Sequence, residues 1–335
     1  MTTGILRRLD SFDTDTQAAI RTVRDAMRLA RSLEGCTLAS TKSDRSPVTM
    51  ADLAIQAVVA RRLAEASPSD SLIAEEDATL LRTDPDLSSQ VVEAVRQIIR
   101  DATVERVLAW IGDGGSDLGS RFWTLDPIDG TKGFLHGRQY VIALALVVDG
   151  GVQMSVIGCP RLSLLHADGP VTIGERPPHG GIAIAVRGHG AWWSSADQNT
   201  CSRLAVSTGR EVSIARVVQS FEGRHGDPER FARVLHSLGN VQPPSLMDSQ
   251  AKHVTVAAGA SDLLMRFPPN AEFHDAVWDQ AAGSLLIEEA GGRVTDLAGQ
   301  PLDFTGGRRL LRNTGMLASN GLLHRAALEA VQRTR

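Results

Sequence analysis

Cysteine is scarce in this chain of 335 residues, which has only three. Cys36, Cys159 and Cys201 are far apart in the sequence, and none of them belongs to a C-x-x-C pair. This spacing argues against a disulfide framework and against a zinc site. It favours a protein that works in a reducing compartment.

Long hydrophobic runs are absent as well. No apolar segment approaches the length of a transmembrane helix, and residues 1–9 lack the apolar core of a secretory signal. The net charge of -4 provides no general attraction to nucleic acids or to anionic lipids. We therefore expect a cytoplasmic protein that binds neither a nucleic acid polymer nor a membrane. A site for an anionic ligand would have to gather its positive charge locally.

Hydrophobic residues make up 42% of the chain, which is enough to build a substantial core. In the N-terminal part, apolar residues at helical spacing predict helices over 15–33 and 88–100. The break at Ser46-Pro-Val-Thr49 predicts a further helix over 50–66, with Asp52 in its first turn. A short apolar run at 71–74 predicts a strand that ends at an acidic pair.

The middle of the chain has the pattern of strands. Residues 141–148 and 152–158 flank Asp149-Gly150-Gly151, which is a strong hairpin signal. These segments predict an antiparallel sheet built as a meander. The further strands expected in it are 162–166, 182–186 and 191–193.

After about residue 205, predicted strands and helices alternate. We therefore predict an α/β fold of the layered α+β type, in which a large, mostly antiparallel sheet is followed by a smaller α/β layer. The expected subdomains are 1–205, carrying the acidic motifs, and 206–335. The predicted C-terminal strands are 216–221, 262–266, 293–295 and 316–319, and the predicted helices are 228–238, 250–258, 278–290 and 322–331.

The most informative stretch is Trp123-Thr-Leu-Asp-Pro-Ile-Asp-Gly-Thr-Lys-Gly-Phe134. Asp126 and Asp129 lie three residues apart, and Pro127 stiffens the turn expected between them. With the hydroxyl of Thr131 they form an oxygen-rich corner that suits Mg²⁺. The alternative is an Asx-turn whose aspartates bind local backbone N–H groups. A bare D-x-x-D would favour that alternative, whereas the longer string D-P-I-D-G-T favours the metal.

Three further acids have an ordinary explanation when each is taken alone. Glu75 could belong to a solvated run of charges, and Asp52 and Asp279 could each favour the first turn of a helix. Together with D-P-I-D-G-T, however, the order of these acids resembles that of a known family. The family comprises the lithium-sensitive, Mg²⁺-dependent phosphomonoesterases, among them inositol monophosphatases, fructose-1,6-bisphosphatases and 3′(2′),5′-bisphosphate nucleotidases. The resemblance implies an αβαβα fold.

The resemblance also implies a metal cluster of two or three Mg²⁺ ions, for which Mn²⁺ can substitute. In the family, the residues that match Glu75, Asp126 and Asp129 hold these ions. The main-chain carbonyl that matches Ile128 and the carboxylate that matches Asp279 are further ligands.

A second pair of matching residues has a catalytic role in the family. The residues that match Asp52 and Thr131 position and deprotonate the attacking water. No cysteine or histidine nucleophile is needed for such chemistry, because metal ions and positioning contribute most to the hydrolysis of a phosphate ester.

The second half of the chain resembles the bisphosphate-nucleotidase branch of the family. Asp248-Ser-Gln-Ala-Lys252, Leu264-Met-Arg266 and Glu222-Gly-Arg-His225 match elements that bind the substrate there. Taken singly, a solvated lysine, a surface arginine and a loop histidine would be the ordinary interpretation. The residues that match a substrate-binding role are Thr131, His225, Ser249, Lys252, Arg266 and Asp279.

We therefore expect hydrolysis of adenosine 3′,5′-bisphosphate to AMP and phosphate. The resemblance implies lithium sensitivity and a role in sulfur assimilation. The alternatives are an inositol monophosphatase or sugar-bisphosphate phosphatase with the same metal core, and a non-catalytic metal-binding protein. Lys252 and Arg266 favour the nucleotidase, because an uncharged polyol gives them nothing to bind. The expected ligand is a small-molecule bisphosphate nucleotide, and either a monomer or a homodimer is compatible with the sequence.

Overall fold

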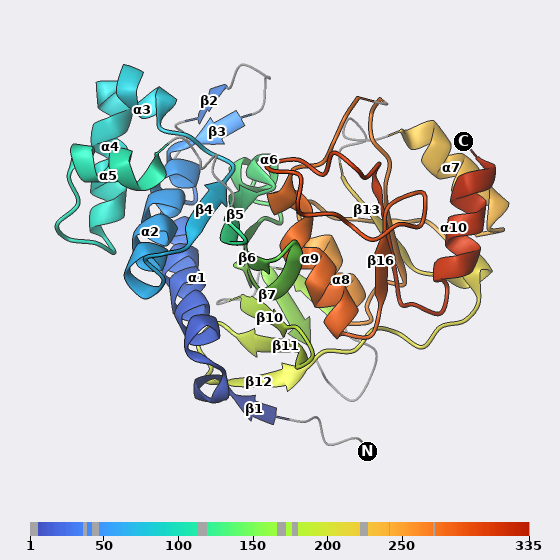
Figure 1. Ribbon diagram of the computed structural model, residues 1–335. Coiled ribbons are helices and arrows are strands. Elements are labelled where there is room, and N and C mark those ends of the chain that lie inside the picture. The colour runs from blue at the N-terminus through green and yellow to red at the C-terminus, as the bar shows by residue number, and fades with distance from the viewer. Residues whose placement is uncertain are drawn as a thin grey trace.

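The computed structural model describes residues 6–35, 39–41, 47–112, 119–165, 172–175, 180–221, 227–240, 242–270 and 272–334. Over these ranges the chain folds into alternating layers of helices and sheets, with helices outermost on both sides (Figure 1). The predicted αβαβα architecture is therefore confirmed. None of the helices described here is long and apolar enough to cross a bilayer.

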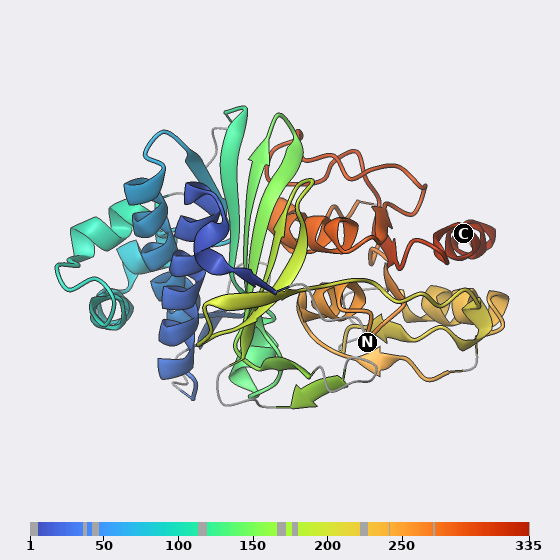
Figure 2. The ribbon, with the colours of Figure 1, turned by 90° about the horizontal axis from the view of Figure 1, so that it is seen from below.

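The first layer contains two long helices, α1 (Thr14–Ser32) and α2 (Met50–Ala66), which cover one face of the large sheet (Figure 2). The side chain of Thr49 caps the first turn of α2, and the carboxylate of Asp52 accepts a hydrogen bond from the Thr49 N–H at 2.7 Å. This capping box fixes Asp52 at the beginning of the helix. The shorter helices of the layer are α3 (Thr79–Thr83), α4 (Pro85–Arg96) and α5 (Val104–Ile111).

The large sheet has eight strands in the order β1-β12-β11-β10-β7-β6-β5-β4. Neighbouring strands pair antiparallel, except for β4 and β5, which are parallel. The strands are β1 (Leu6–Arg8), β4 (Ser71–Ala74), β5 (Arg121–Asp129), β6 (Val141–Val148), β7 (Gly151–Cys159), β10 (Gly181–Val186), β11 (Gly190–Ser195) and β12 (Thr200–Arg203).

The two faces of this sheet differ in the size of their side chains. In β6, Ile142 and Leu144 belong to the core shared with α1 and α2, whereas Ala143 and Ala145 belong to the core shared with α9 (Val277–Glu289). Strand β10 repeats the alternation of isoleucine and alanine. Because successive side chains of a strand point to opposite faces, the alanines form one surface on which α9 can lie close to the backbone.

The middle helical layer consists of α8 (Ala251–Ala257) and α9, and it separates the two sheets (Figure 2). The small sheet has the order β14-β13-β15-β17-β16, with β13 parallel to both β14 and β15. Its outer face packs on α7 (Pro228–Ser237) and α10 (His324–Arg333). The strands are β13 (Val217–Gln219), β14 (Ser245–Leu246), β15 (Leu263–Arg266), β16 (Arg293–Thr295) and β17 (Met316–Ser319).

Most predicted elements are confirmed, and some of their bounds coincide with those observed, as in α2, β4, β6 and β17. The third predicted helix is shifted: α4 begins at Pro85, because Asp84 caps it and Pro85 occupies the first turn. The prediction that 162–166 continues the meander is wrong. Strand β8 (Leu162–Leu165) pairs with β9 (Thr172–Glu175) in a separate two-stranded sheet, and β7 pairs directly with β10.

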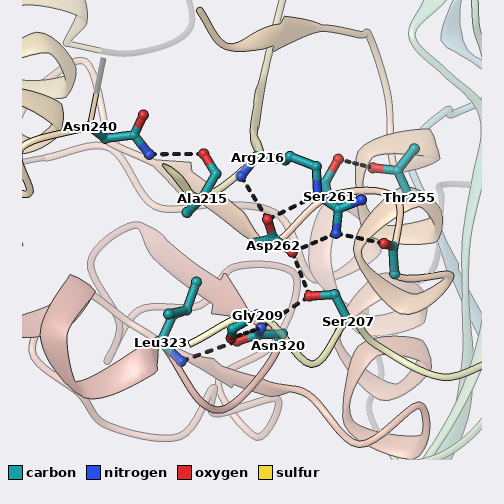
Figure 3. Close-up of polar contacts among 11 residues, drawn as sticks. Ser207, Gly209, Ala215, Arg216, Asn240, Thr255, Ser261, Asp262, Asn320 and Leu323 are labelled. Carbon is teal, nitrogen blue, oxygen red and sulfur yellow. Dashed lines mark hydrogen bonds and ion pairs between the residues drawn. The ribbon is translucent and has the colours of Figure 1, made fainter. Parts of the chain in front are cut away.

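A polar network fixes the segment that crosses from the large sheet to the small one (Figure 3). The carboxylate of Asp262 accepts hydrogen bonds from the Arg216 backbone N–H at 2.7 Å, from the Arg216 guanidinium and from the Ser207 hydroxyl. The Asn320 amide donates to Ser207 and to the carbonyl of Gly209. Both ends of the crossing segment are therefore tied to the beginning of β15 and the end of β17.

The predicted division at residue 205 stays a proposal. All strands of the large sheet precede it, and all strands of the small sheet follow it. A single hydrophobic core, however, joins the alanine face of the large sheet, α9 and one face of the small sheet. The two parts are thus packed on one another through a common apolar layer.

The Asp262 network leads to a stability prediction. Replacing Asp262 with Asn should lower the free energy of unfolding by about 1–3 kcal/mol, because one acceptor oxygen facing Arg216 becomes a donor. These hydrogen bonds lower the pKa of Asp262, although burial opposes them. The network therefore stabilises the protein above the ordinary pKa of an aspartate, and this contribution is lost as the pH falls below it.

Urea unfolding at pH 7 and at pH 3 measures both effects. Asp101→Asn is the matched control, since Asp101 pairs with Arg106 on the exposed surface. It should change the stability by less than about 0.5 kcal/mol. An Asp262→Asn variant as stable as this control at pH 7 would contradict the structural role of the network.

Candidate active site

The acidic motif lies at the carboxyl end of β5. Asp126 pairs with Ala143 and Asp129 with Val141, so two residues of β5 stand opposite one residue of β6. This bulge is a position where a strand tolerates proline, because Pro127 has no N–H to donate. The stretch predicted as a turn is therefore the bulged end of a strand. Gly130, with a φ of 91°, turns the chain into the short helix α6 (Thr131–Leu135).

Glu75 follows directly on β4, and its backbone N–H donates to the carbonyl of Leu125 at 3.2 Å. Because β4 and β5 are parallel, their carboxyl ends meet at the same edge of the sheet. Glu75 and Asp126 therefore come from neighbouring strand ends, as their predicted metal-binding roles would require.

Asp52 and Thr131 also lie together, although 79 positions separate them in the sequence. The Thr131 hydroxyl lies 3.4 Å from Asp52 Oδ1 and 3.2 Å from the carbonyl oxygen of Ile128. The other oxygen of Asp52 accepts from the backbone and the hydroxyl of Thr49. One oxygen of this buried carboxylate is thus held by the helix cap, and the other faces Thr131.

Asp279 lies in the first turn of α9, and its carboxylate faces the guanidinium of Arg266. Arg266 Nη2 lies 3.4 Å from Asp279 Oδ2, and Arg266 Nε lies 2.5 Å from Asp275 Oδ1. Burial raises the pKa of Asp279 to about 7, although Arg266 opposes this shift. Asp275, which the sequence did not single out, therefore fixes the arginine that faces Asp279.

Gln250 joins three elements of the site. Its backbone N–H donates to Asp129 Oδ2 at 2.5 Å. Its side chain donates to the carbonyl of Trp278 at 3.0 Å and accepts from the N–H of Gly283 at 2.9 Å. Gln250 was not predicted as a site residue, although the S-Q-x-K motif contains it. The hydrogen bonds attach the beginning of α8 to β5 on one side and to α9 on the other.

The basic residues face the acidic ones across a small cavity. Lys252 is only 8% exposed, and burial lowers its pKa to about 8, although the nearby Asp129 carboxylate opposes this. The left-handed backbone of Ser249, with a φ of 65°, places it at the turn before α8. The cavity of about 40 Å³ is lined by Asp129, Ser249, Gln250, Lys252, His253, Leu264, Met265, Arg266, Asp279, Gln280 and Met316.

The acids fit divalent cations in donor type and in charge. Asp126 is 2% exposed, and its Oδ1 has no hydrogen-bond partner among the residues that the structure describes. Burial raises its pKa well above the ordinary range, and the charges of Glu75, Asp129 and Asp279 raise it further. A cation at this edge would neutralise the repulsion. Among the described residues, however, no three Asp, Glu, His or Cys side chains already converge in a ligand arrangement.

Of the predicted site residues, the structure thus brings Asp52 next to Thr131 and Arg266 next to Asp279. It also gathers Asp129, Ser249 and Lys252 around one cavity. His225 lies outside the described residues, so its predicted contact with the substrate stays a prediction.

The layered fold and the carboxylate-rich strand ends define the class of protein. The IMPase of Thermotoga maritima superposes with a TM-score of 0.65 over 94% of this chain and 95% of its own, at 20% identity. This likeness concerns the fold alone. The model of the inositol monophosphatase family matches residues 6–335. The chain belongs to the inositol monophosphatase family.

Relatives within the family carry a narrower description. A 3′(2′),5′-bisphosphate nucleotidase of Schizosaccharomyces pombe is 38% identical, over 96% of this chain and 95% of that protein. A 3′(2′),5′-bisphosphate nucleotidase of Oryza sativa is also 38% identical, over 96% and 94% of the two chains.

The repulsion at Asp126 leads to a second prediction. Replacing Asp126 with Asn should raise the unfolding free energy of chelator-treated protein by about 0.5–2 kcal/mol, because it removes a buried charge that others repel. The raised pKa means that metal-free wild type should lose stability as the pH rises above the ordinary range of an aspartate. The variant should lack this part of the pH dependence.

Urea unfolding in EDTA at pH 5 and pH 8 tests this expectation. Glu93→Gln on the exposed surface of α4 is the control and should be neutral within about 0.5 kcal/mol. If Asp126→Asn is instead less stable than wild type in EDTA, the carboxylate is stabilised by partners rather than repelled.

Proposed function

We propose that this chain is a Mg²⁺-dependent 3′(2′),5′-bisphosphate nucleotidase, which hydrolyses adenosine 3′,5′-bisphosphate to AMP and phosphate. The observation that carries the proposal is the pairing of opposite charges in one place. Asp129 at the end of β5 and Asp279 in α9 line one cavity together with Lys252 and Arg266. Glu75 and the buried Asp126 lie at the same edge of the large sheet. A substrate with two phosphates needs both a cation site and fixed positive charge. The bisphosphate nucleotidases among the relatives support the same substrate.

The metal-binding role falls to residues at the edge of the large sheet. Glu75, Asp126, Asp129 and the carbonyl of Ile128 would hold two or three Mg²⁺ ions, with Asp279 as a further ligand. Such ions, when bound, activate a water molecule and stabilise the leaving oxygen. Mn²⁺ can substitute, because it accepts the same oxygen ligands.

Asp52 and Thr131 supply the proton-transfer path in the protein itself. A water that donates to the Thr131 hydroxyl would be aligned with the phosphorus, and the Thr131 proton can move to the facing oxygen of Asp52. Asp52 keeps this orientation because Thr49 holds its other oxygen. The water oxygen bonds to phosphorus as the ester P–O bond breaks, and the leaving oxygen takes up a proton from solvent.

Lys252 and Arg266 would bind the phosphate that is not cleaved. Arg266 offers a planar fork, and its pairing with Asp275 orients that fork toward the cavity. Lys252 adds a point charge on the first turn of α8. Ser249 and His225 would contact the remainder of the nucleotide.

An inositol monophosphatase or sugar-bisphosphate phosphatase remains the rival, since it would use the same acids. Two cationic side chains in the cavity, the buried Lys252 and the half-buried Arg266, favour the nucleotidase. Thr131 beside Asp52 speaks against a non-catalytic metal-binding protein, because a structural site needs no group that deprotonates water. Location in the cytoplasm, a role in sulfur assimilation and a monomeric or homodimeric state stay predictions.

The metal assignment predicts a defined ion dependence. Mg²⁺ or Mn²⁺ should support turnover, whereas excess Ca²⁺ should inhibit, because it is larger and adopts looser coordination. Asp129→Asn should abolish phosphate release and leave the circular dichroism spectrum unchanged.

Li⁺ at low concentration should inhibit by competing for one Mg²⁺ position. Near-normal turnover of Asp129→Asn would refute the metal assignment, whereas insensitivity to Li⁺ would refute only the lithium prediction.

The substrate assignment predicts a selective loss in Lys252→Met. Its kcat/KM for adenosine 3′,5′-bisphosphate should fall by about one to two decades, the cost of a charge-assisted hydrogen bond. Its kcat/KM for 3′-AMP should change much less, since that substrate lacks the second phosphate. Equal losses on both substrates would instead favour an inositol monophosphatase or sugar-bisphosphate phosphatase.

The pH profile provides the matched control. Because the pKa of Lys252 is about 8, its charge is present below that pH and is lost above it. In wild type, kcat/KM for the bisphosphate should therefore fall above about pH 8 relative to that for 3′-AMP. Lys252→Arg keeps its charge at this pH, so the relative fall should disappear.

A further inference from the structure

Arg308 lies in the loop that precedes β17, and its backbone is fixed to the beginning of α9. The N–H of Val277 donates to the carbonyl of Arg308 at 3.1 Å. Ala276 and Arg309 form an isolated antiparallel bridge, and the N–H of Leu310 donates to the carbonyl of Asp275. The position of Arg308 is therefore set by the same residues that begin α9.

The side chain of Arg308 reaches the other sheet. Its Nη2 donates to the carbonyl of Ala74 at 2.8 Å, across 234 positions of sequence. Ala74 is the last residue of β4, which is the edge strand of the large sheet, and Glu75 follows it directly. The bond thus holds a carbonyl on the unpaired side of an edge strand, while the Glu75 N–H is held by Leu125 on the other side.

The same guanidinium also contacts the residue before Asp279. Its central carbon lies 4.6 Å from the ring centroid of Trp278, which is 7% exposed. This distance is typical of a cation stacked on an aromatic face. One side chain therefore contacts the immediate neighbours of two carboxylates, Glu75 in the first half of the chain and Asp279 in the second.

We propose that Arg308 is a positioning residue. It holds Glu75 and Asp279 in the relative positions that a shared cluster of divalent cations requires. The inference rests on the proposed function, and it assigns no contact between Arg308 and the substrate. Partners that orient metal ligands typically contribute about one to two decades of metal affinity. The competing explanation is that the guanidinium is only a counter-charge for the acids near it, Glu75, Glu76 and Asp77. A counter-charge would weaken cation binding rather than strengthen it.

Two substitutions separate these explanations. Arg308→Lys keeps the charge but loses the planar fork and its stacking, whereas Arg308→Met keeps apolar contact with Trp278 and loses the charge. Arg309→Met is the matched control, because Arg309 is exposed, lies farther from the Trp278 ring at 6.0 Å and bonds only the carbonyl of His274 among the contacts described. Mn²⁺ binding to each full-length variant, without substrate, is measured by titration calorimetry and electron paramagnetic resonance.

We expect both Arg308 variants to bind Mn²⁺ about 10- to 100-fold more weakly, and Arg309→Met to stay within about twofold of wild type. At saturating Mn²⁺ the kcat of Arg308→Lys should approach that of wild type, since the defect lies in metal affinity. Unchanged affinity in both variants, or tighter binding by Arg308→Met alone, would overturn the proposal. So would loss of folding in both variants, seen as collapse of the thermal transition in EDTA. A wild type that binds no Mn²⁺ would instead refute the proposed function itself.

Discussion

Carboxylates that repel one another are brought together at the edge of the large sheet, and the rest of the site is arranged around them. The parallel pairing of β4 with β5 brings Glu75 beside Asp126, and α9 adds Asp279. Within the described part of the chain, one oxygen of Asp126 has no hydrogen-bond partner, and no cationic side chain is among the causes of its raised pKa. Such repulsion costs stability. Under the proposed function this cost has a purpose, because an uncompensated cluster of carboxylate oxygens attracts divalent cations.

The groups that oppose this negative charge compensate it only in part. Asp129 receives a backbone N–H from Gln250, and Arg266 divides its charge between Asp275 and Asp279. In its proposed role, an arginine shared in this way would orient a phosphate without cancelling the negative potential that favours cations. Gln250 fixes the geometry of the site, because the hydrogen bonds of this one residue connect β5 with α9.

Elements with strong periodicity were predictable from the sequence, and so was the family. The apolar run of β6 fixed even its bounds. For α2 the break in the chain before Met50 indicated the beginning of the helix, where Thr49 and Asp52 form a capping box. Residues whose role depends on tertiary contacts were not predictable. Gln250 and Asp275 act through partners far away in the chain. The S-Q-x-K motif contains Gln250 without indicating its bonds to β5 and α9, and no local pattern distinguishes Asp275. The strand β8 was placed in the wrong sheet, because an apolar run does not name its pairing partner.

The alanine face of the large sheet sets the spacing between acidic residues of the active site. Alanines at 143 and 145 in β6, and their counterparts in β10, set how deeply α9 lies on the sheet. The depth of α9 in turn sets the distance of Asp279 from the strand that carries Asp126. A single added methyl group in this apolar layer would therefore change the spacing between Asp126 and Asp279. The packing of the core and the spacing of the acidic residues in the active site are therefore coupled.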